Sequence, residues 1–443
     1  MSISISEHFT YRKLLRFTFP SVCMLIFSSI YGVVDGFFVS NFAGETEFAA
    51  VNFIMPFLMM LGGIGFMFGT GGSALVAKTL GEGEKEKANK IFSLVVYVSI
   101  AVAVIIAAAG IAFLRPVARL LGAEGDLLEK CVVYGRIILI ALPAFVLQME
   151  FQSLFVTAEK PKLGLAVTVL SGVVNMVLDA LLVGVIKGGL VGAALATAMS
   201  QFVGGIVPVI YFAQKNKSLL KLERTSWDAK ALLKVCTNGS SELLSNISMS
   251  VVGMLYNLQL MKYAGQNGIS AYGVIMYVGF IFISAFIGYS VGVAPIVGFN
   301  FGSDNKKELK GIFKKSLVVI SVGAVVMVSS CYAFSDGLSA LFVGNNPQLL
   351  EMTCEAFSIY SLVFLFAGYA IFFSGFFTAL NDGLTSAVIS FLRTVVFQIA
   401  AVFILPLFFD TVGIWWSVVV AEVLAVVVAV IFILAKKKKY GYI

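Results

Sequence analysis

Asp35 lies in a long apolar run that begins near Leu14, within the stretch Ser28-Ser29-Ile30-Tyr31-Gly32-Val33-Val34-Asp35. Burying a carboxylate in hydrocarbon costs a few kcal/mol or more unless it is paired, solvated or protonated. A second acid, Asp179, lies in another apolar run, four residues after Asn175, so a helix would place both on one face. These residue types indicate ion chemistry inside a membrane.

The composition defines the class of protein that must hold these residues. The chain of 443 residues is 59% hydrophobic and only 12% charged, which is not typical of a soluble domain of this size. Apolar segments of about 20 residues recur along the whole length, whereas a membrane barrel would show alternating strands of roughly ten residues. We therefore expect an all-α integral membrane protein, whose first apolar segment lacks a cleavage signal and stays in the mature protein.

Charged and Gly/Pro clusters divide the chain into twelve candidate spans. They lie near 13–40, 48–78, 90–114, 131–157, 163–186, 190–214, 231–262, 268–300, 311–335, 350–378, 384–408 and 412–435. Of the 31 Lys and Arg residues, 24 fall in the loops and tails on the side of the N-terminus and five on the opposite side. This asymmetry predicts that both termini are cytoplasmic, as expected for a multi-pass protein of a bacterial inner membrane.

The second half of the sequence repeats the first with an offset of 221 residues. Gly44 aligns with Gly265, Gly81 with Gly302, and the motif Thr157-Ala158 with Thr378-Ala379, without a gap. We interpret this register as an internal duplication. It predicts an N-terminal six-helix bundle (1–213), a cytoplasmic linker (214–234) and a C-terminal six-helix bundle (235–443). Six spans per half give both bundles the same orientation around a central cavity, and their rocking would alternate access to it.

Counting residues from the loops places several polar side chains at one depth. Asp35, Asp179 and Thr197 lie eight to ten residues from the outer loops, and Asn175 lies one helical turn deeper than Asp179. Their oxygens suit a hard cation such as Na⁺, and two neighbouring acids suit a proton equally well. The equivalent positions in the second half are Tyr256, Val396, Ala400 and Val418. We therefore predict one ion-coupling site, in the N-terminal half only.

Other polar residues within the spans are candidates for the wall of the central cavity or for contacts between helices. Glu150 and Glu242 lie in the cytoplasmic halves of spans four and seven and could attract cationic substrates to the cavity, with Tyr31 as a third candidate. Interhelical hydrogen bonding is the alternative role for the two acids. Arg393 and Glu422 lie at mid-depth on adjacent spans and predict a structural ion pair.

Several function classes find no support in the sequence. The single histidine, His8, and the five scattered cysteines form no catalytic or metal-binding pattern, so we expect reduced thiols, no cofactor and no enzymatic activity. An ATP-binding loop motif is absent, so transport energy would come from an ion gradient. The net charge of +7 arises from loop cations rather than a nucleic-acid surface.

The motifs together resemble the multidrug and toxic compound extrusion (MATE) family, in its bacterial DinF-like and MepA-like branch. The resemblance rests on Pro20 and Asp35 in span one, Gly81-Glu82-Gly83 after span two, and Asn175-x-x-x-Asp179 in span five. It implies an antiporter that expels organic cations and amphipathic drugs as Na⁺ or H⁺ enters, and it implies coupling roles for Asp35, Asn175, Asp179 and Thr197. Span ten has Glu355 only near its outer end, so the acid pattern of the NorM-like branch is not reproduced.

Two other functions remain open at this stage: a flippase for a lipid-linked precursor, and an exporter of one specific metabolite. A flippase cavity would be expected to carry several cations for phosphates, and only Arg136 and Arg393 lie within spans. In each case the partners would be small molecules and the lipid bilayer, and we expect a monomer.

Overall fold

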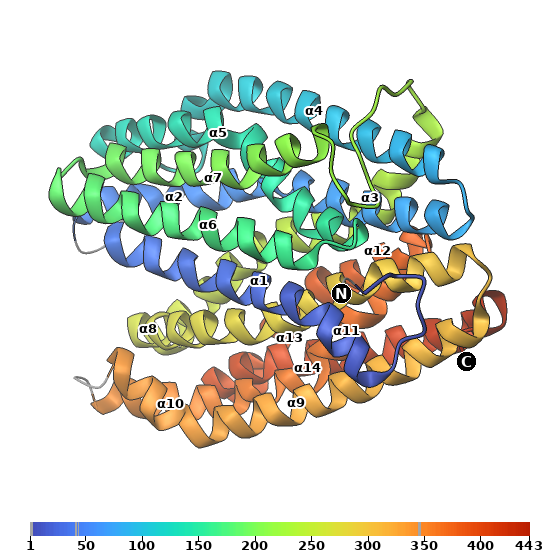
Figure 1. Cartoon of the computed structure of the whole chain (residues 1–443). Coiled ribbons are helices and arrows are strands. Elements are labelled where there is room, and N and C mark those ends of the chain that lie inside the picture. The colour runs from blue at the N-terminus through green and yellow to red at the C-terminus, as the bar shows by residue number, and fades with distance from the viewer. Residues whose placement is uncertain (1–2, 40–41, 43, 344–346) are drawn as a thin grey trace.

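The protein is built from helices throughout the residues that the structure describes. This computed structural model describes residues 3–39, 42, 44–343 and 347–443, and no strand occurs among them. A chain in hydrocarbon must satisfy its backbone hydrogen bonds internally, which apolar segments of this length achieve as helices. The all-α prediction is confirmed, and the helices run roughly side by side along the long axis (Figure 1).

The first half contains seven α-helices and one π-helical segment within the described ranges. In chain order they are α1 (Tyr11–Phe38), α2 (Glu45–Gly62), α3 (Ile64–Gly81), α4 (Lys85–Leu120), α5 (Gly125–Thr157), α6 (Pro161–Asp179), π-helix η2 (Ala180–Val185) and α7 (Gly189–Ala213). α2 and α3 together form one apolar span, and η2 extends α6. The predicted end of the first span, at 40, lies outside the described residues.

The second half contains α8 (Ala229–Gly302), α9 (Lys306–Val343), α10 (Pro347–Ser361), α11 (Val363–Ala379), α12 (Gly383–Phe391), π-helix η3 (Leu392–Phe397), α13 (Gln398–Ile404) and α14 (Pro406–Tyr440). The 74 residues of α8 would be about 110 Å long as one straight helix, far more than a bilayer. The helix breaks at Gly265, so it crosses twice. α10 and α11 form one span bent by 43°. The described residues thus provide the predicted twelve crossings.

Left-handed backbone turns repeat between the halves at the offset found in the sequence. Positive φ angles occur at Gly44 and Gly265 (114° and 62°), at Gly83 and Asp304 (83° and 52°), and at Gly189 and Asp410 (52° and 48°). Each pair is separated by 221 residues. Such angles disfavour most side chains, so agreement at three loops is independent support for the duplication.

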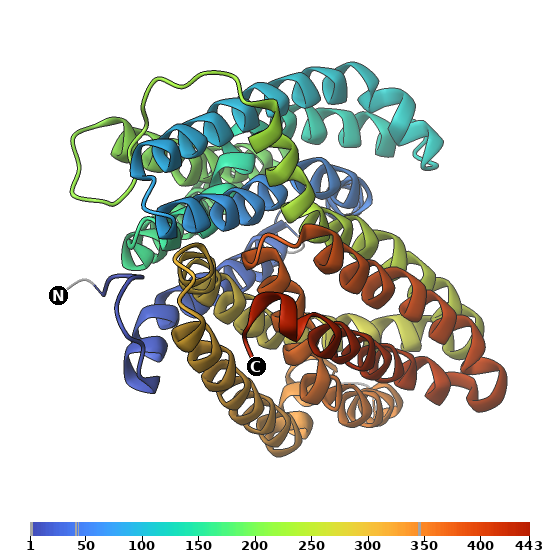
Figure 2. The same ribbon diagram turned by 90° about the vertical axis from the view of Figure 1, so that its right-hand side faces the viewer.

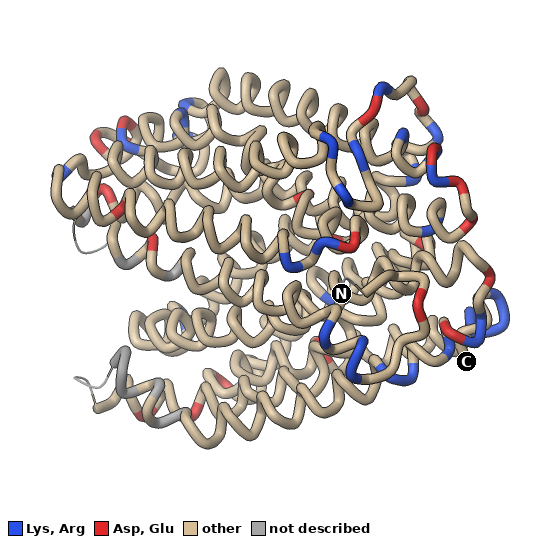
Figure 3. The backbone as a smooth tube through the Cα atoms, in the orientation of Figure 1, with Lys and Arg blue, Asp and Glu red and all other residues tan. Residues whose placement is uncertain are grey.

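The two halves lie on either side of a boundary formed mainly by α1, α3 and α8 (Figures 1 and 2). α8 packs along both α3 and α1, while α4 to α7 cover one side and α9 to α14 the other. Lys and Arg gather at the end of the molecule that holds the linker and the C-terminus (Figure 3). The bundle boundaries at 213 and 235 stay a prediction.

At the end that holds the termini, the halves touch through their backbones. A Cβ atom on Gly81 would lie 2.1 Å from the Phe299 carbonyl oxygen, and one on Gly302 would lie 2.1 Å from that of Lys78. Gly81 and Gly302 are equivalent positions in the repeat, so each half presents the same glycine to the other. This paired contact closes the boundary at that end.

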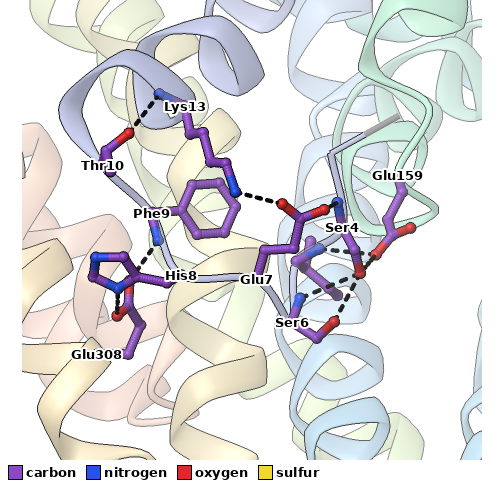
Figure 4. A network of polar contacts seen from close by, with 10 residues as sticks. Ser4, Ser6, Glu7, His8, Phe9, Thr10, Lys13, Glu159 and Glu308 are labelled. Atoms are coloured by element: carbon purple, nitrogen blue, oxygen red, sulfur yellow. Dashed lines mark hydrogen bonds and ion pairs between the residues drawn. The ribbon is translucent and has the colours of Figure 1, made fainter. Parts of the chain in front are cut away.

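The N-terminal segment Ile3–Thr10, which we name the strap, crosses the same end of the molecule (Figure 4). Its first attachment is to Glu159, which follows α5 in the first half. Glu159 Oε1 accepts hydrogen bonds from Ser4 Oγ at 2.6 Å and from the Ile5 N–H at 2.8 Å.

The second attachment of the strap is to the start of α9 in the second half. The Phe9 N–H donates to Glu308 Oε1 at 2.8 Å, and His8 Nδ1 lies 2.6 Å from Glu308 Oε2. The Lys315 ammonium also donates to the Phe9 carbonyl. The strap therefore joins elements that belong to different halves of the repeat.

Candidate ion-coupling site and central cavity

Asp35 on α1 meets side chains from α6 and α7 inside the first half. Thr197 Oγ1 on α7 donates to Asp35 Oδ1 at 3.4 Å, and Asp35 also interacts with Asn175 and Asp179 on α6. Asn175 and Asp179 are 1% and 0% exposed. The structure therefore brings together the four residues that depth counting placed at one level.

The oxygen atoms of this cluster outnumber the hydrogen-bond donors near them. Both carboxylate oxygens of Asp179 and the Oδ1 atom of Asn175 are buried without a hydrogen-bond partner among the described residues. No Lys or Arg forms an ion pair with Asp35 or Asp179 in the described part of the chain. Buried oxygens of this kind are costly unless a proton or a cation satisfies them. The donor set fits a hard cation or a proton as its ligand.

The end of α6 has an irregular backbone next to the acid. The α-helix ends at Asp179, and the following residues Ala180–Val185 continue as a π-helix. A π-helical segment inserts an extra residue per turn and is frequent at functional sites. Here it changes the rotation of the helix directly after Asp179, while Asn175 and Asp179 keep their common face on the preceding α-helical turn.

A polar network that depth counting missed leads away from the cluster. Ser200 Oγ donates to the Thr197 carbonyl at 2.8 Å, and Ser171 Oγ donates to the Ser200 carbonyl at 2.7 Å. Gln148 Nε2 donates to Ser171 Oγ at 3.3 Å and to the Tyr31 hydroxyl at 3.5 Å. These residues are polar positions within apolar spans, and that polarity was the sequence signal available for finding them.

Tyr134 on α5 is a further side chain that the sequence did not single out. It is 1% exposed and interacts with Thr197 and with the charges of both acids. Its hydroxyl also lies 3.9 Å from the Met55 sulfur. Tyr134 therefore forms part of the wall of the acid cluster.

A separate cavity of about 890 Å³ lies at the boundary between the halves. The second half supplies most of its wall, including Glu242 and the aromatic side chains of Tyr256, Tyr272 and Phe280. The first half supplies small polar residues from α1, α3 and α5. These are Ser28, Ser29, Thr70, Ser73 and Ser153. The volume and the mixed aromatic and polar wall are suited to a small organic molecule.

The three predicted cavity residues occupy different places. As far as the structure describes the cavity wall, it includes Glu242 but neither Glu150 nor Tyr31. Glu150 is 0% exposed, its oxygens lack a hydrogen-bond partner, and its backbone packs on Gly69. Tyr31 instead meets Gln148 inside the first half. Helix rotation, which depth counting does not determine, separates these residues from the cavity.

The predicted ion pair between Arg393 and Glu422 is confirmed. Arg393 Nε lies 2.9 Å from each Glu422 carboxylate oxygen, and the side chains are 16% and 4% exposed. Both residues line the cavity, and Glu242 lies within electrostatic range of Arg393. Arg393 belongs to the second π-helical segment, η3.

The position equivalent to Asp35 carries no acid in the second half. Tyr256 occupies it, and its hydroxyl donates to Gln398 Oε1 at 2.9 Å while its ring stacks on Tyr272 at 5.5 Å. The equivalents of the other three cluster residues are Val396, Ala400 and Val418. The acid cluster is therefore a feature of one half.

Comparisons with known proteins agree with this architecture. The sequence profile of the MatE family matches the chain twice, over residues 20–181 and 243–404. The chain is 25% identical over 434 residues to the Multidrug export protein MepA of Staphylococcus haemolyticus, covering 98% of this chain and 95% of the relative. It is 25% identical to MepA of Staphylococcus aureus strain MRSA252, covering 96% and 93%.

Solved structures share the fold at lower sequence identity. One is described as the outward-facing conformation of a multidrug resistance MATE family transporter of the MOP superfamily; it aligns with a TM-score of 0.91 at 21% identity, covering 97% of this chain and 98% of that chain. A MATE crystallised with MaL6 aligns with a TM-score of 0.91 at 20% identity, covering 98% and 97%. Because the family profile covers most of the sequence in two copies, this chain belongs to the MATE family of multi-pass membrane transporters and is not an enzyme.

Proposed function

We propose that this transporter is a cation-coupled antiporter that exports organic cations and amphipathic drugs. The observation that carries the proposal is the contact between Asp35 and the fully buried Asp179, whose two carboxylate oxygens have no hydrogen-bond partner among the described residues. The cavity wall combines aromatic faces with Glu242 and so favours cationic, partly apolar molecules. The staphylococcal relatives named as multidrug export proteins support the same substrate class.

α1 is a common wall of the acid cluster and the cavity. Ser28, Ser29 and Gly32 line the cavity, while Asp35 on the same helix belongs to the cluster. Ser29 Oγ also lies 2.5 Å from Ser284 Oγ of α8, across the boundary between the halves. Because both ligands act on one helix, a change of α1 that accompanies cation binding would alter substrate affinity, and linkage makes this effect reciprocal.

The cation would be Na⁺ or H⁺, entering from the side opposite the termini. Asp35, Asp179, Asn175 and Thr197 would supply oxygen ligands to Na⁺, or the two acids would share a proton. Binding would favour the state with low substrate affinity, so that substrate leaves as the cation enters. We place both termini in the bacterial cytoplasm, with bundles 1–213 and 235–443 rocking about the linker 214–234.

Transport of lipid-linked phosphates is less well supported. Among the described residues that line the cavity, Arg393 is the one Lys or Arg, and Glu422 neutralises it. A phosphate group would therefore find no unpaired cation at this wall.

The test is efflux from proteoliposomes under imposed gradients of Na⁺ or H⁺, with a fluorescent organic cation as substrate. We expect one of the two gradients to drive uphill movement of the dye, and Asp35→Asn and Asp179→Asn each to abolish it. Dye movement at the wild-type rate in either variant, or transport that needs neither gradient, would contradict the coupling proposal.

A further inference from the structure

A groove of about 370 Å³ lies between the start of α1 and the start of α6, at the end of the molecule that holds the termini. It is separate from both the acid cluster and the central cavity. Its size falls within the range of small-molecule sites in proteins. We refer to it as the inner groove.

Three cations border the inner groove, from two helices. Arg16 comes from the second turn of α1, and Lys160 and Lys162 flank Pro161, the first residue of α6. None of the three forms an ion pair within the described residues, although other lysines at this end do. α6 also directs the positive end of its dipole toward the groove. The groove therefore holds three cations that form no ion pair with a described side chain.

The one acid in the groove wall is already engaged. Glu159 Oε1 accepts the Ser4 hydroxyl and the Ile5 N–H of the strap. These contacts hold the carboxylate against the strap, and the three cations still outnumber this single acid among the described residues of the groove wall.

The floor of the inner groove is apolar. Phe17, Pro20 and Leu163 line it, and Pro20 lies one helical turn further into the span than Arg16. The neighbouring side chains Leu15 and Phe19 are 47% and 65% exposed on α1, as expected for a surface that faces acyl chains. The cations of the inner groove therefore lie directly next to its apolar residues.

The equivalent place in the second half has the opposite character. Lys160 directly precedes α6 and Asp382 directly precedes α12, and Asp382 pairs with Lys436 at 2.6 Å. Tyr440 donates to the same carboxylate oxygen at 2.8 Å. An acid that pairs with a lysine therefore stands in the second half where the first half has Lys160, which forms no ion pair among the described residues.

We propose that the inner groove binds an anionic phospholipid from the leaflet on the side of the termini, with its phosphate among Arg16, Lys160 and Lys162 and its acyl chains along Phe17, Pro20 and Leu163. Anionic headgroups are attracted to such cations by about 1 kcal/mol for each Lys or Arg near the surface. The lipid would hold α1 and α6, the two helices that carry Asp35 and Asp179, against each other at their inner ends. This site does not depend on the identity of the transported substrate.

The experiment uses the full-length protein in an uncharged detergent and dioctanoyl phosphatidylglycerol as the probe, with binding measured by native mass spectrometry and by the shift in unfolding temperature. Dioctanoyl phosphatidylcholine and glycerol 3-phosphate are the comparison ligands. We expect phosphatidylglycerol to bind at least tenfold more tightly than either of them. Equal binding of both lipids would overturn the proposal, and glycerol 3-phosphate binding as tightly as phosphatidylglycerol would show a free-phosphate site instead.

Charge variants locate the binding. Replacing Arg16, Lys160 and Lys162 together by Gln should weaken phosphatidylglycerol binding by about 100-fold. The matched control replaces Lys215, Lys217 and Lys230 of the linker region by Gln, which removes the same charge and should change binding by less than twofold. If the triple variant does not fold, Lys162→Gln alone should weaken binding by about fivefold. Wild-type affinity in either groove variant would overturn the proposal.

Discussion

The two halves of this transporter share a backbone plan but treat buried charge in opposite ways. The first half places Asp35 beside the buried Asp179 with no cationic partner among the described residues, and the second half pairs Glu422 with Arg393. Both arrangements lie next to a π-helical segment, η2 or η3. A charge that is paired within the protein stabilises one conformation. A carboxylate without an internal partner can bind an external cation, and that cation then favours the conformation to which it binds more tightly. The comparison therefore separates a structural role from a coupling role.

Breaking the ion pair should give the largest effect on stability. Glu422→Gln leaves the Arg393 guanidinium without its partner, and we expect a loss of about 3 kcal/mol in the free energy of unfolding. Thermal unfolding in detergent measures it. The double variant Arg393→Met with Glu422→Met should recover most of that loss. A wild-type unfolding temperature for Glu422→Gln would show that the pair is not structural.

Removing an acid from the cluster should reduce transport without reducing stability, in contrast to breaking the ion pair. Asp179→Asn removes a charge that has no partner, so the unfolding temperature should stay the same or rise. Cation-driven efflux should be lost, a fall of at least about 100-fold, which corresponds to the upper range of coupling free energies between two sites. Drug accumulation in cells, with membrane abundance as control, tests this. Loss of stability without loss of coupling would remove the distinction between the halves.

The contacts of Gly81 and Gly302 are equivalent in the two halves, so substitutions at these two positions should have similar effects. Gly81→Ala and Gly302→Ala each force a Cβ against a carbonyl oxygen of the other half, at an expected cost of about 2 kcal/mol to the closed contact. Because the positions are equivalent, both variants should change the distance between labels across the boundary by similar amounts. A large effect from only one of them would mean that the contact is not symmetric.

The Asp382 contacts predict a smaller effect that depends on pH. Burial raises the pKa of Asp382, but hydrogen bonds from Lys436, Tyr440 and Thr385 outweigh it, so the pKa lies below its usual value. A lowered folded-state pKa adds stability above the unfolded pKa, near 4, and this stability is lost as pH falls through the folded pKa. Wild type should exceed Asp382→Asn by about 1 kcal/mol at pH 6, and the gap should close below pH 4. A constant gap would contradict this assignment.

Sequence reasoning predicted what depends on hydrophobicity and spacing along the chain. Twelve crossings follow from the length of apolar runs, and the 221-residue register anticipates the left-handed turns at Gly44 and Gly265. Depth counting placed Thr197 and Asp35 at one level, and the structure shows that they are in contact. These predictions required only the position of a residue along the chain or along its helix axis.

Features that depend on helix rotation or distant contacts could not be predicted. Glu150 and Glu242 have similar depths, yet one is enclosed in the first half and the other faces the cavity. Spans that are apolar all around give no sign of which side faces a neighbour. The attachment of Ser4 to Glu159 joins residues 155 positions apart, and no local pattern in the sequence indicates it.

The strap also has a consequence for the order in which the protein is assembled. Its residues are made before all of the spans, but Glu308, which holds His8 and Phe9, is made only after eight spans have been synthesised. The strap must therefore wait outside the bilayer while most of the chain is inserted. Their attachment is among the last steps of assembly, so a protease site placed at residue 6 would report when the newly made transporter is complete.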